Sequence, residues 1–282
     1  MIRRALTPQR RRRIKAFVAR GLELDGHLVT PRLPHRILIG THHKPGTVWL
    51  QSIFKAICAQ YSLRFFSGTQ DRLPADWQVF FDHGSDFDLA RVPVPFRGLH
   101  MIRDPRDVIV SGCFYHQTSR ERWLHEPRAT LGGRTYQEVI NGYSRLEDRM
   151  LFEMDQAGAV TIDRMSRWDY SHPCFFELRY EDLIADVDLM LFHRAFVFLG
   201  FPPAMLPTLL EIAYGESLFS ERRHRSDHIR SGDAHQWPPY FTRRLRERFQ
   251  QRFGDVLVRL GYEPDDTWVE KADHLTRPTP PP

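Results

Sequence analysis

The stretch HRILIGTHHKPGTVWLQSIFKAICAQY, residues 35–61, predicts a buried strand, a short loop and the start of a helix, in that order. Ile37, Leu38 and Ile39 form an apolar run that Gly40 ends, as is typical of a short buried strand. From Thr47 onward, apolar residues recur at helical spacing, at positions 49, 50, 53, 54, 57 and 58. Because a helix start presents unpaired N–H groups and the positive end of the helix dipole, residues 41–47 are predicted to bind an anion.

The loop contains a lysine, but not where nucleoside triphosphatases carry theirs. Lys44 precedes Gly46 by two positions, whereas the Walker A motif has Gly-Lys-Ser/Thr in that order. The sequence therefore disfavours an ordinary ATP- or GTP-hydrolysing protein. A βα turn that holds a lysine by chance is the alternative, although lysine occurs only at positions 15, 44, 55 and 271 of the chain.

Length and patterning favour the α/β class. The 282 residues allow a large core, and short strand patterns alternate with helical ones. We expect a basic arm over residues 1–34, the main domain over residues 35–265 and a Pro-rich tail over residues 266–282. The arm contains an arginine run at residues 10–13, which we interpret as a solvated segment rather than a nucleic-acid anchor.

Composition also limits the functional classes. The longest apolar stretch, residues 189–201, is broken by His193 and Arg194 and is shorter than the ~20 residues that cross a bilayer. The first residues lack the apolar core of a signal peptide. The three cysteines are odd in number and isolated, which favours reduced thiols in the cytoplasm and no metal site. The net charge of +5, with arginine as the main cation, suits a polyanionic ligand.

Further elements follow from the same patterns. Strands are expected at residues 78–82, 98–102 and 174–178, and residues 62–77 are expected to be irregular. A helix should begin with Asp104 as its N-cap and Pro105 at its first position, and should run to about residue 117. Residues 120–133 are expected to form a loop over the site. Single long helices are expected over residues 135–156, 180–200, 203–214 and 241–260.

Arg103 stands between the strand at residues 98–102 and this helix start. An arginine beside a helix N-terminus can clamp a phosphate, and pairing with Asp104 or Asp107 is the plainer alternative. Ser111 follows ~10 Å along the helix at 1.5 Å per residue, so spacing alone does not bring it to Arg103.

Two of these segments resemble motifs of the PAPS-dependent sulfotransferases. The order Lys-x-Gly-Thr-x-Trp at residues 44–49 is similar to the family's 5′-phosphosulfate loop, Pro-Lys-Ser-Gly-Thr-Thr-Trp. RDPRDVIVSGCFYH, residues 103–116, is similar to the 3′-phosphate motif Arg-Asn-Pro-Lys-Asp-Val-x-Val-Ser and keeps its Arg-to-Ser interval. Weaker resemblances lie at residues 180–183 (Tyr-Glu-Asp-Leu), 217–219 (Ser-Leu-Phe, for Thr-Ser-Phe) and 230–242 (for Arg-Lys-Gly-x-x-Gly-Asp-Trp-Lys-x-x-Phe-Thr).

The resemblance implies a P-loop-like three-layer fold with a central, mainly parallel sheet flanked by helices. It also implies transfer of a sulfonate group from PAPS to an acceptor hydroxyl or amine, with release of 3′-phosphoadenosine 5′-phosphate (PAP) and without a metal. Lys44 would stabilise charge on the leaving oxygen. Trp49 would stack on adenine, unless it is a core tryptophan. The implied donor-binding residues are Lys44, Gly46, Thr47, Val48, Trp49, Arg103, Ser111, Tyr180, Ser217, Phe219, Arg230, Ser231 and Gly232.

A base must remove the proton from a neutral acceptor hydroxyl, and histidine is the usual choice near pH 7. His83 ends the strand at residues 78–82, as the catalytic histidine ends the family's Lys-Thr-His. Here Asp82 precedes it, and Asp82 or Asp86 would orient the ring. An ordinary surface histidine is the alternative. His42 and His43 flank Lys44 and could touch the sulfonate, and ordinary loop residues are the alternative for both. His100 is interpreted as a buried histidine of the third strand, and His116 as a structural group.

Three positions depart from the family pattern. Pro45 replaces serine and lacks an N–H, Val48 replaces threonine and lacks a hydroxyl, and Ser231 replaces lysine and lacks a charge. These changes motivate a catalytically weak PAP-binding relative as an alternative, beside a P-loop-like kinase and a basic binding module. The acceptor is expected to be a small molecule, a glycan or a lipid. A homodimer is possible, and no nucleic acid and no transmembrane segment are expected.

Overall fold

The structure, a computed structural model, describes residues 33–217 and 232–271. These residues fall into two compact units. The first unit contains the described residues up to Ile102 and from Asp169 to Gly232, and the second contains those from Arg103 to Trp168 and from Asp233 onward. Most of the expected arm and tail lie outside the described residues, so the domain boundaries stay predictions.

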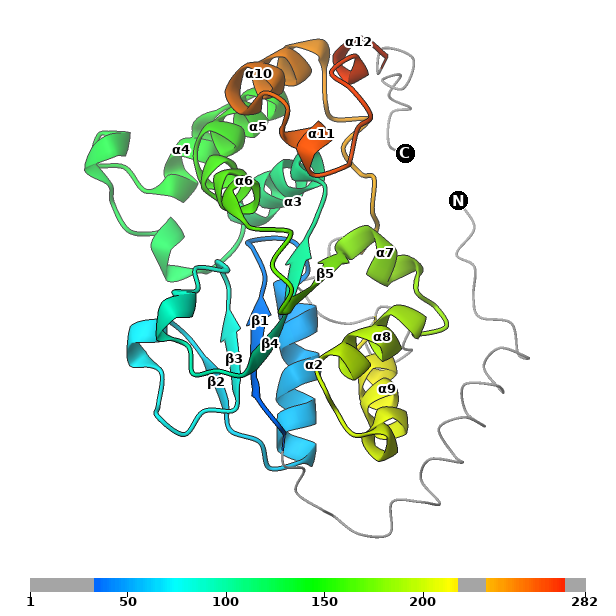
Figure 1. The fold of residues 1–282 in the computed structure, drawn as a ribbon. Coiled ribbons are helices and arrows are strands. Elements are labelled where there is room, and N and C mark those ends of the chain that lie inside the picture. Colours follow the sequence, from blue (N-terminus) through cyan, green and yellow to red (C-terminus); the bar gives the residue numbers. More distant parts are fainter. Residues whose placement is uncertain (1–32, 218–231, 272–282) are drawn as a thin grey trace. The chain divides into compact units, whose positions relative to one another are not determined.

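The first unit is built on a five-stranded sheet in which every strand is parallel to its neighbours (Figure 1). Its strands are β1 (Arg36–Gly40), β2 (Phe65–Ser67), β3 (Val79–Asp82), β4 (Phe96–Ile102) and β5 (Phe175–Arg179). They lie in the order β2-β3-β1-β4-β5. The expected α/β class with a parallel sheet and flanking helices is confirmed.

The strand order marks one end of β1 as a place for a ligand. From β1 the chain builds β2 and β3 on one side, and it then crosses to β4 on the other side. Sheets of this kind bind ligands beyond the carboxyl ends of their strands, at the point where the order reverses. The loop after β1, which is the predicted anion-binding loop, lies at this point.

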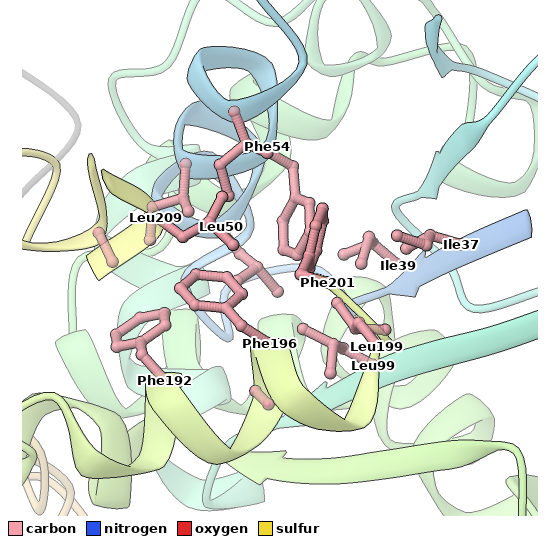
Figure 2. Packing of buried hydrophobic residues seen from close by; sticks show 14 of the residues in the cluster. Ile37, Ile39, Leu50, Phe54, Leu99, Phe192, Phe196, Leu199, Phe201 and Leu209 are labelled. Carbon is pink, nitrogen blue, oxygen red and sulfur yellow. The ribbon is translucent and has the colours of Figure 1, made fainter. Parts of the chain in front are cut away.

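Helix α2 (Thr47–Gln60) packs its apolar face into the core of the first unit. The six positions predicted to face inward are all buried: Trp49, Leu50, Ile53, Phe54, Ile57 and Cys58. They pack with β1, with α8 (Met190–Phe198) and with α9 (Leu206–Gly215), as Figure 2 shows for Phe54, Phe196 and Leu209. Burial of each large apolar side chain contributes roughly 1.5–3 kcal/mol. This packing fixes the start of α2 relative to the end of β1.

The second unit is helical over its described residues. Helix α3 (Pro105–His116) starts as predicted, because the Asp104 carboxylate accepts a hydrogen bond from the Arg106 backbone N–H and Pro105 occupies the first position. The other helices are α4 (Tyr136–Gly142), α5 (Leu146–Asp155), α6 (Ala157–Arg167), α10 (Arg243–Phe253), α11 (Val256–Arg259) and α12 (Trp268–Lys271). Short 3-10 turns in this unit lie at Arg122–Leu124 and Ala129–Leu131. Those of the first unit lie at Gln70–Arg72, Leu89–Arg91 and Pro203–Met205.

Three of the long helices predicted from the sequence are wrong, because each is interrupted. The predicted helix at residues 135–156 divides into α4 and α5 after Gly142, a poor helix former. The helix at residues 180–200 divides into α7 (Tyr180–Ala185) and α8, because the Asp186 carboxylate accepts from the backbone N–H groups of Leu191 and Phe192 at 2.8 and 3.2 Å. The helix at residues 241–260 ends early at Gly254, which has a φ of 55°.

Two smaller corrections concern strand β2 and helix α9. Residues 62–77 are not wholly irregular, because Phe65–Ser67 pairs with β3. The helix predicted over residues 203–214 begins as a 3-10 turn and becomes α-helical at Leu206. The three strands predicted at residues 78–82, 98–102 and 174–178 are confirmed to within two residues at each end.

Candidate functional site

The loop between β1 and α2 is closed by hydroxyl groups at its two ends. The Thr47 hydroxyl donates to the His42 carbonyl oxygen at 2.6 Å, and the Thr41 hydroxyl donates to Thr47 Oγ1 at 3.1 Å. Between them, Lys44 and Gly46 have φ angles of 73° and 93°. A left-handed φ suits glycine but is strained for lysine. The loop therefore holds Lys44 in a conformation that its own sequence does not favour.

The start of α2 keeps the electrostatic character of a bare helix terminus. Its N-cap is Gly46, which has no side chain to cap it, and its first turn contains no acidic residue. The positive end of the helix dipole is therefore uncompensated by the chain's own first turn, which favours an anion there. Val48, the second residue of the helix, has 51% of its surface exposed.

The structure brings four predicted donor-binding residues of the first unit together. A Cβ atom at Gly46 would approach the Tyr180 ring within 3.0 Å, so only glycine fits there without a shift of the ring. Trp49 meets Tyr180 edge-on, with ring centroids 6.3 Å apart. The Tyr180 hydroxyl donates to the carbonyl oxygen of Gly232 at 3.1 Å. Residues far apart in the sequence thus converge on the loop.

Trp49 lies within the core, with 5% of its surface exposed, and its ring also packs against Phe192. These surroundings are those of a core tryptophan, which was the alternative to stacking on adenine. Its Nε1 atom is buried and has no hydrogen-bond partner among residues 33–217 and 232–271. A buried indole N–H normally has an acceptor, so this donor departs from the usual pattern among the described residues.

Arg103 begins the second unit and is held by its neighbours there. Its Nη2 atom donates to Asp107 Oδ2 at 3.1 Å and to the Asp233 carbonyl oxygen at 3.0 Å. The other Asp107 oxygen accepts from the backbone N–H groups of Gln236 and Trp237 at 2.8 and 2.9 Å. The pairing alternative with Asp107 is therefore what the structure shows. Ser111 is half-buried further along α3.

Asp107 is fully buried, and burial raises the pKa of its carboxyl, against the lowering effect of the Arg103 guanidinium. Asp104 pairs instead with Arg106, whose guanidinium lies over the Trp237 ring at 3.8 Å. The segment from Asp233 to Trp237 is thus fixed to the start of α3 by charged groups and by backbone donors.

Replacing Arg103 by alanine is expected to lower the free energy of unfolding by about 3–5 kcal/mol, because it leaves the buried Asp107 carboxylate without its cation. Urea denaturation measures the loss. Arg122→Ala is the matched control, since Arg122 forms an exposed pair with Glu126 and should cost less than about 1 kcal/mol. Equal losses for the two variants would contradict the role assigned to Arg103.

His83 is exposed at the end of β3, where two polar side chains meet its ring. Ser67 Oγ lies 3.2 Å and Gln51 Nε2 lies 3.4 Å from His83 Nε2. The Gln51 amide also donates to Ser67 Oγ at 3.0 Å. Asp82, which was expected to orient the ring, accepts instead from the backbone N–H groups of Gly84 and Asp86.

A triad of hydrogen-bonded polar side chains beside the loop, His42, His100 and Glu177, was not predicted from the sequence. His42 Nε2 lies 2.8 Å from His100 Nε2, and His100 Nδ1 lies 2.6 Å from Glu177 Oε2. His42 and His100 are almost wholly buried, so the prediction of a buried structural His100 is confirmed. The sequence carries no signal for the triad, because only the register of β4 with β5 places His100 opposite Glu177.

Burial lowers the pKa of His100 to about 3, although the Glu177 carboxylate lies beside it. An unfolded histidine has a pKa of ~6.5, so between these values the unfolded chain binds more protons and stability rises with pH. As the pH falls below 6, the free energy of unfolding of the wild-type protein should fall by up to ~1.4 kcal/mol per pH unit more than that of His100→Gln, because glutamine does not titrate. Urea denaturation at pH 5, 6 and 7 tests this, and a pH-independent difference would contradict it.

The remaining predicted residues are scattered or lie outside the described part. Ser217 is buried at the end of α9, where its hydroxyl donates to the Tyr214 carbonyl oxygen at 2.7 Å. Phe219, Arg230 and Ser231 lie outside the described residues. No cluster of histidine, cysteine, aspartate and glutamate within residues 33–217 and 232–271 is arranged to hold a metal. In the same residues, no helix is long and apolar enough to cross a membrane.

Comparison with known proteins gives matches in structure but not in sequence. No protein-family model matches the chain, and no curated protein does. The mouse sulfotransferase SULT7A1 complexed with PAP matches with a TM-score of 0.55 and 14% identity, over 92% of this chain and 94% of that chain. A retinol dehydratase in complex with androsterone and the inactive cofactor PAP matches with a TM-score of 0.50 and 16% identity, over 90% and 95%. The chain therefore has the sulfotransferase fold.

Proposed function

We propose that this chain, which has the sulfotransferase fold, moves a sulfonate group from PAPS to an acceptor and releases PAP. One observation carries the proposal. The loop that resembles the phosphosulfate loop joins β1 to a helix start without a cap, and its Gly46 packs against Tyr180, another residue of the predicted donor site. The PAP bound in the two similar structures supports the same donor.

Lys44 and the start of α2 are proposed to act where the bond to the donor breaks. PAPS supplies an activated sulfonate, and its transfer leaves negative charge on an oxygen of the 5′-phosphate. The Lys44 ammonium and the backbone N–H groups of Gly46, Thr47 and Val48 would stabilise that charge. Because the loop is already closed by the Thr47 hydroxyl, these donors need little reorganisation during the reaction.

The nucleoside end of the donor is assigned to the aromatic residues around Gly46. Tyr180 and Trp49 pack edge to face, and the Trp49 N–H has no acceptor among the described residues. A nucleobase provides both a π-face and hydrogen-bond acceptors, which suits this pair. Ser217 and Phe219 are proposed to flank the base on the strength of the resemblance alone.

On the strength of the resemblance alone, the residues proposed for the 3′-phosphate are Arg103, Ser111, Arg230, Ser231 and Gly232. Asp107 and the Asp233 carbonyl fix one nitrogen of Arg103, which leaves the guanidinium in a defined position. A planar guanidinium held in this way suits bidentate binding of a phosphate. Adenosine 5′-phosphate and adenosine 5′-diphosphate lack this 3′-phosphate, so these residues would favour PAPS and PAP over those nucleotides.

His83 is proposed to take the proton from the acceptor hydroxyl. The oxygen of the acceptor then attacks sulfur, and the electron pair of the breaking S–O bond passes to the departing PAP. His83 is exposed, as a base that meets a diffusing acceptor must be, and Ser67 and Gln51 restrain its ring. The acceptor is proposed to be a small molecule, a glycan or a lipid that bears a hydroxyl or amine.

A catalytically weak PAP-binding relative is the second candidate, and two residues of the loop favour it. Pro45 offers no N–H, and the exposed Val48 offers no hydroxyl where the family has serine and threonine. A cytoplasmic location and a homodimer are further proposals. The three cysteines form no disulfide, which suits a reducing compartment.

Transfer of labelled sulfonate from PAPS to a panel of phenols, alcohols, sugars and lipids tests the proposal. Transfer to at least one acceptor, without added divalent metal, is the expected result. Tight PAP binding without any transfer would favour the catalytically weak relative. Phosphate transfer from ATP in place of sulfonate transfer would overturn the proposal in favour of a kinase.

A further inference from the structure

Two buried rings, His42 and His100, and the half-buried Glu177 carboxylate form a hydrogen-bonded triad that joins the lysine loop to two neighbouring strands. His42 is the second residue after β1, His100 lies in β4, and Glu177 lies in β5. These strands are adjacent in the sheet, with Gly40 opposite His100 and His100 opposite Glu177. These hydrogen-bonded side chains therefore run across the sheet from the loop to β5. The function proposed above uses none of the triad's three members.

Counting protons fixes the tautomers of both rings. A hydrogen bond between two Nε2 atoms 2.8 Å apart contains a single proton, so one ring donates and the other accepts. The Glu177 carboxylate only accepts, so His100 carries its proton on Nδ1. A neutral His100 then has a bare Nε2, and His42 must donate from its own Nε2. Glu177 thus determines, through His100, which nitrogen of His42 carries the proton.

Burial keeps the His100 ring neutral, with its proton on Nδ1. The pKa of His100 is lowered to about 3 by burial, so the ring stays neutral near pH 7. Tyr170 packs edge-on to the same ring, with centroids 5.6 Å apart. The bond between the two buried rings holds one arrangement, because breaking it leaves a ring nitrogen without a partner and without water.

His42 is attached at both its ring and its backbone. The ring is bound to β4 through His100, and the backbone carbonyl accepts from the Thr47 hydroxyl at the start of α2. Lys44, with its strained φ, lies in the loop between His42 and Thr47. A conformation of this kind persists only when its surroundings determine it. The two hydrogen bonds of His42 restrain the loop on the N-terminal side of Lys44.

We propose that Glu177 and His100 are positioning residues for Lys44, acting through the ring of His42. This inference rests on the proposed function for its catalytic consequence, but its structural content does not. Loss of the carboxylate lets His100 move its proton to Nε2, where it faces the proton of His42. The hydrogen bond between the rings is then lost or reversed, and the loop relaxes.

Three variants of the full chain test this inference by NMR. In ¹⁵N-labelled wild-type protein at pH 7, His100 should appear as the Nδ1–H tautomer and His42 as the Nε2–H tautomer. Glu177→Leu should lose this pattern and shift the backbone amide resonances of residues 42–47. Glu177→Gln keeps an acceptor oxygen for His100 and should retain both. Glu211→Leu, at an exposed position of α9, is the matched control.

The kinetic consequence is a fall in kcat. A misplacement of a reacting group by ~1 Å costs about 10²-fold in rate, so Glu177→Leu should lower kcat by about 10- to 100-fold, with rescue by Glu177→Gln. An Nε2–H tautomer or an imidazolium for His100 in the wild type would overturn the inference. So would unchanged loop resonances in Glu177→Leu. Failure of the proposed function would appear differently, as a wild-type protein with the expected tautomers but no sulfonate transfer.

Discussion

Replacing Lys44 by alanine should lower kcat for sulfonate transfer by about 10²–10³-fold, the usual effect of removing one preorganised donor from a developing oxyanion. The free energy of unfolding should change by less than about 1 kcal/mol, because alanine at a φ of 73° is as strained as lysine and the loop stays closed by the Thr47 hydroxyl. Steady-state kinetics with labelled PAPS and urea denaturation measure the two effects.

Lys55→Ala is the matched control for this variant. Lys55 lies on the exposed side of the same helix, where its ammonium donates to Gln51 Oε1 at 3.3 Å. Its removal should leave kcat within about two-fold of the wild-type value, as surface substitutions usually do. Wild-type turnover by Lys44→Ala would remove Lys44 from the proposed mechanism, whatever the control shows.

Replacing His83 by alanine should lower kcat by about 10²–10⁴-fold with an aliphatic alcohol as acceptor, because a general base contributes rate factors of that size. With a phenol that is already ionised at the assay pH, the acceptor has no proton to lose. The same variant should then retain most of the wild-type rate. The comparison of the two acceptors separates proton removal from a loss of acceptor binding.

His125→Ala is the corresponding control, since His125 is exposed and its ring contacts a backbone carbonyl oxygen of Ser119. It should leave both rates unchanged. A loss in His83→Ala that is equal for the alcohol and the ionised phenol would show that His83 binds the acceptor rather than removing its proton. No loss with either acceptor would exclude His83 from the site.

The parts of the fold that depend on neighbouring residues could be predicted from the sequence. The strand, loop and helix at residues 35–61 follow from a run of apolar residues, a glycine and a helical periodicity. The start of α3 follows from Asp104 and Pro105. The break between α7 and α8 could not be predicted, because the Asp186 carboxylate binds backbone groups that a continuous helix would have used. Strand β2, three residues long, owes its extended form to its pairing with β3.

The site divides in the same way. Lys44, Gly46 and Trp49 are close in sequence, so their motif is visible before the fold is known. The contact of Gly46 with Tyr180 needs tertiary structure, and so does the opposition of His100 to Glu177, which depends on strand register. A one-residue slip between β4 and β5 would separate these two side chains. Of the two partners of Arg103, Asp107 is four residues away in the sequence and could be predicted, whereas the Asp233 carbonyl is 130 residues away and could not.

The donor itself provides the most direct test of the proposed function. Isothermal titration calorimetry of the full chain with PAP, ADP and AMP compares ligands that share adenosine and a 5′-phosphate. A charge-assisted hydrogen bond contributes about 1.5–3 kcal/mol, so two contacts to the 3′-phosphate should make PAP bind roughly 100-fold or more tightly than ADP. Comparable affinities for the three nucleotides, or no binding of PAP, would contradict the assignment of this chain as a PAPS-dependent sulfotransferase.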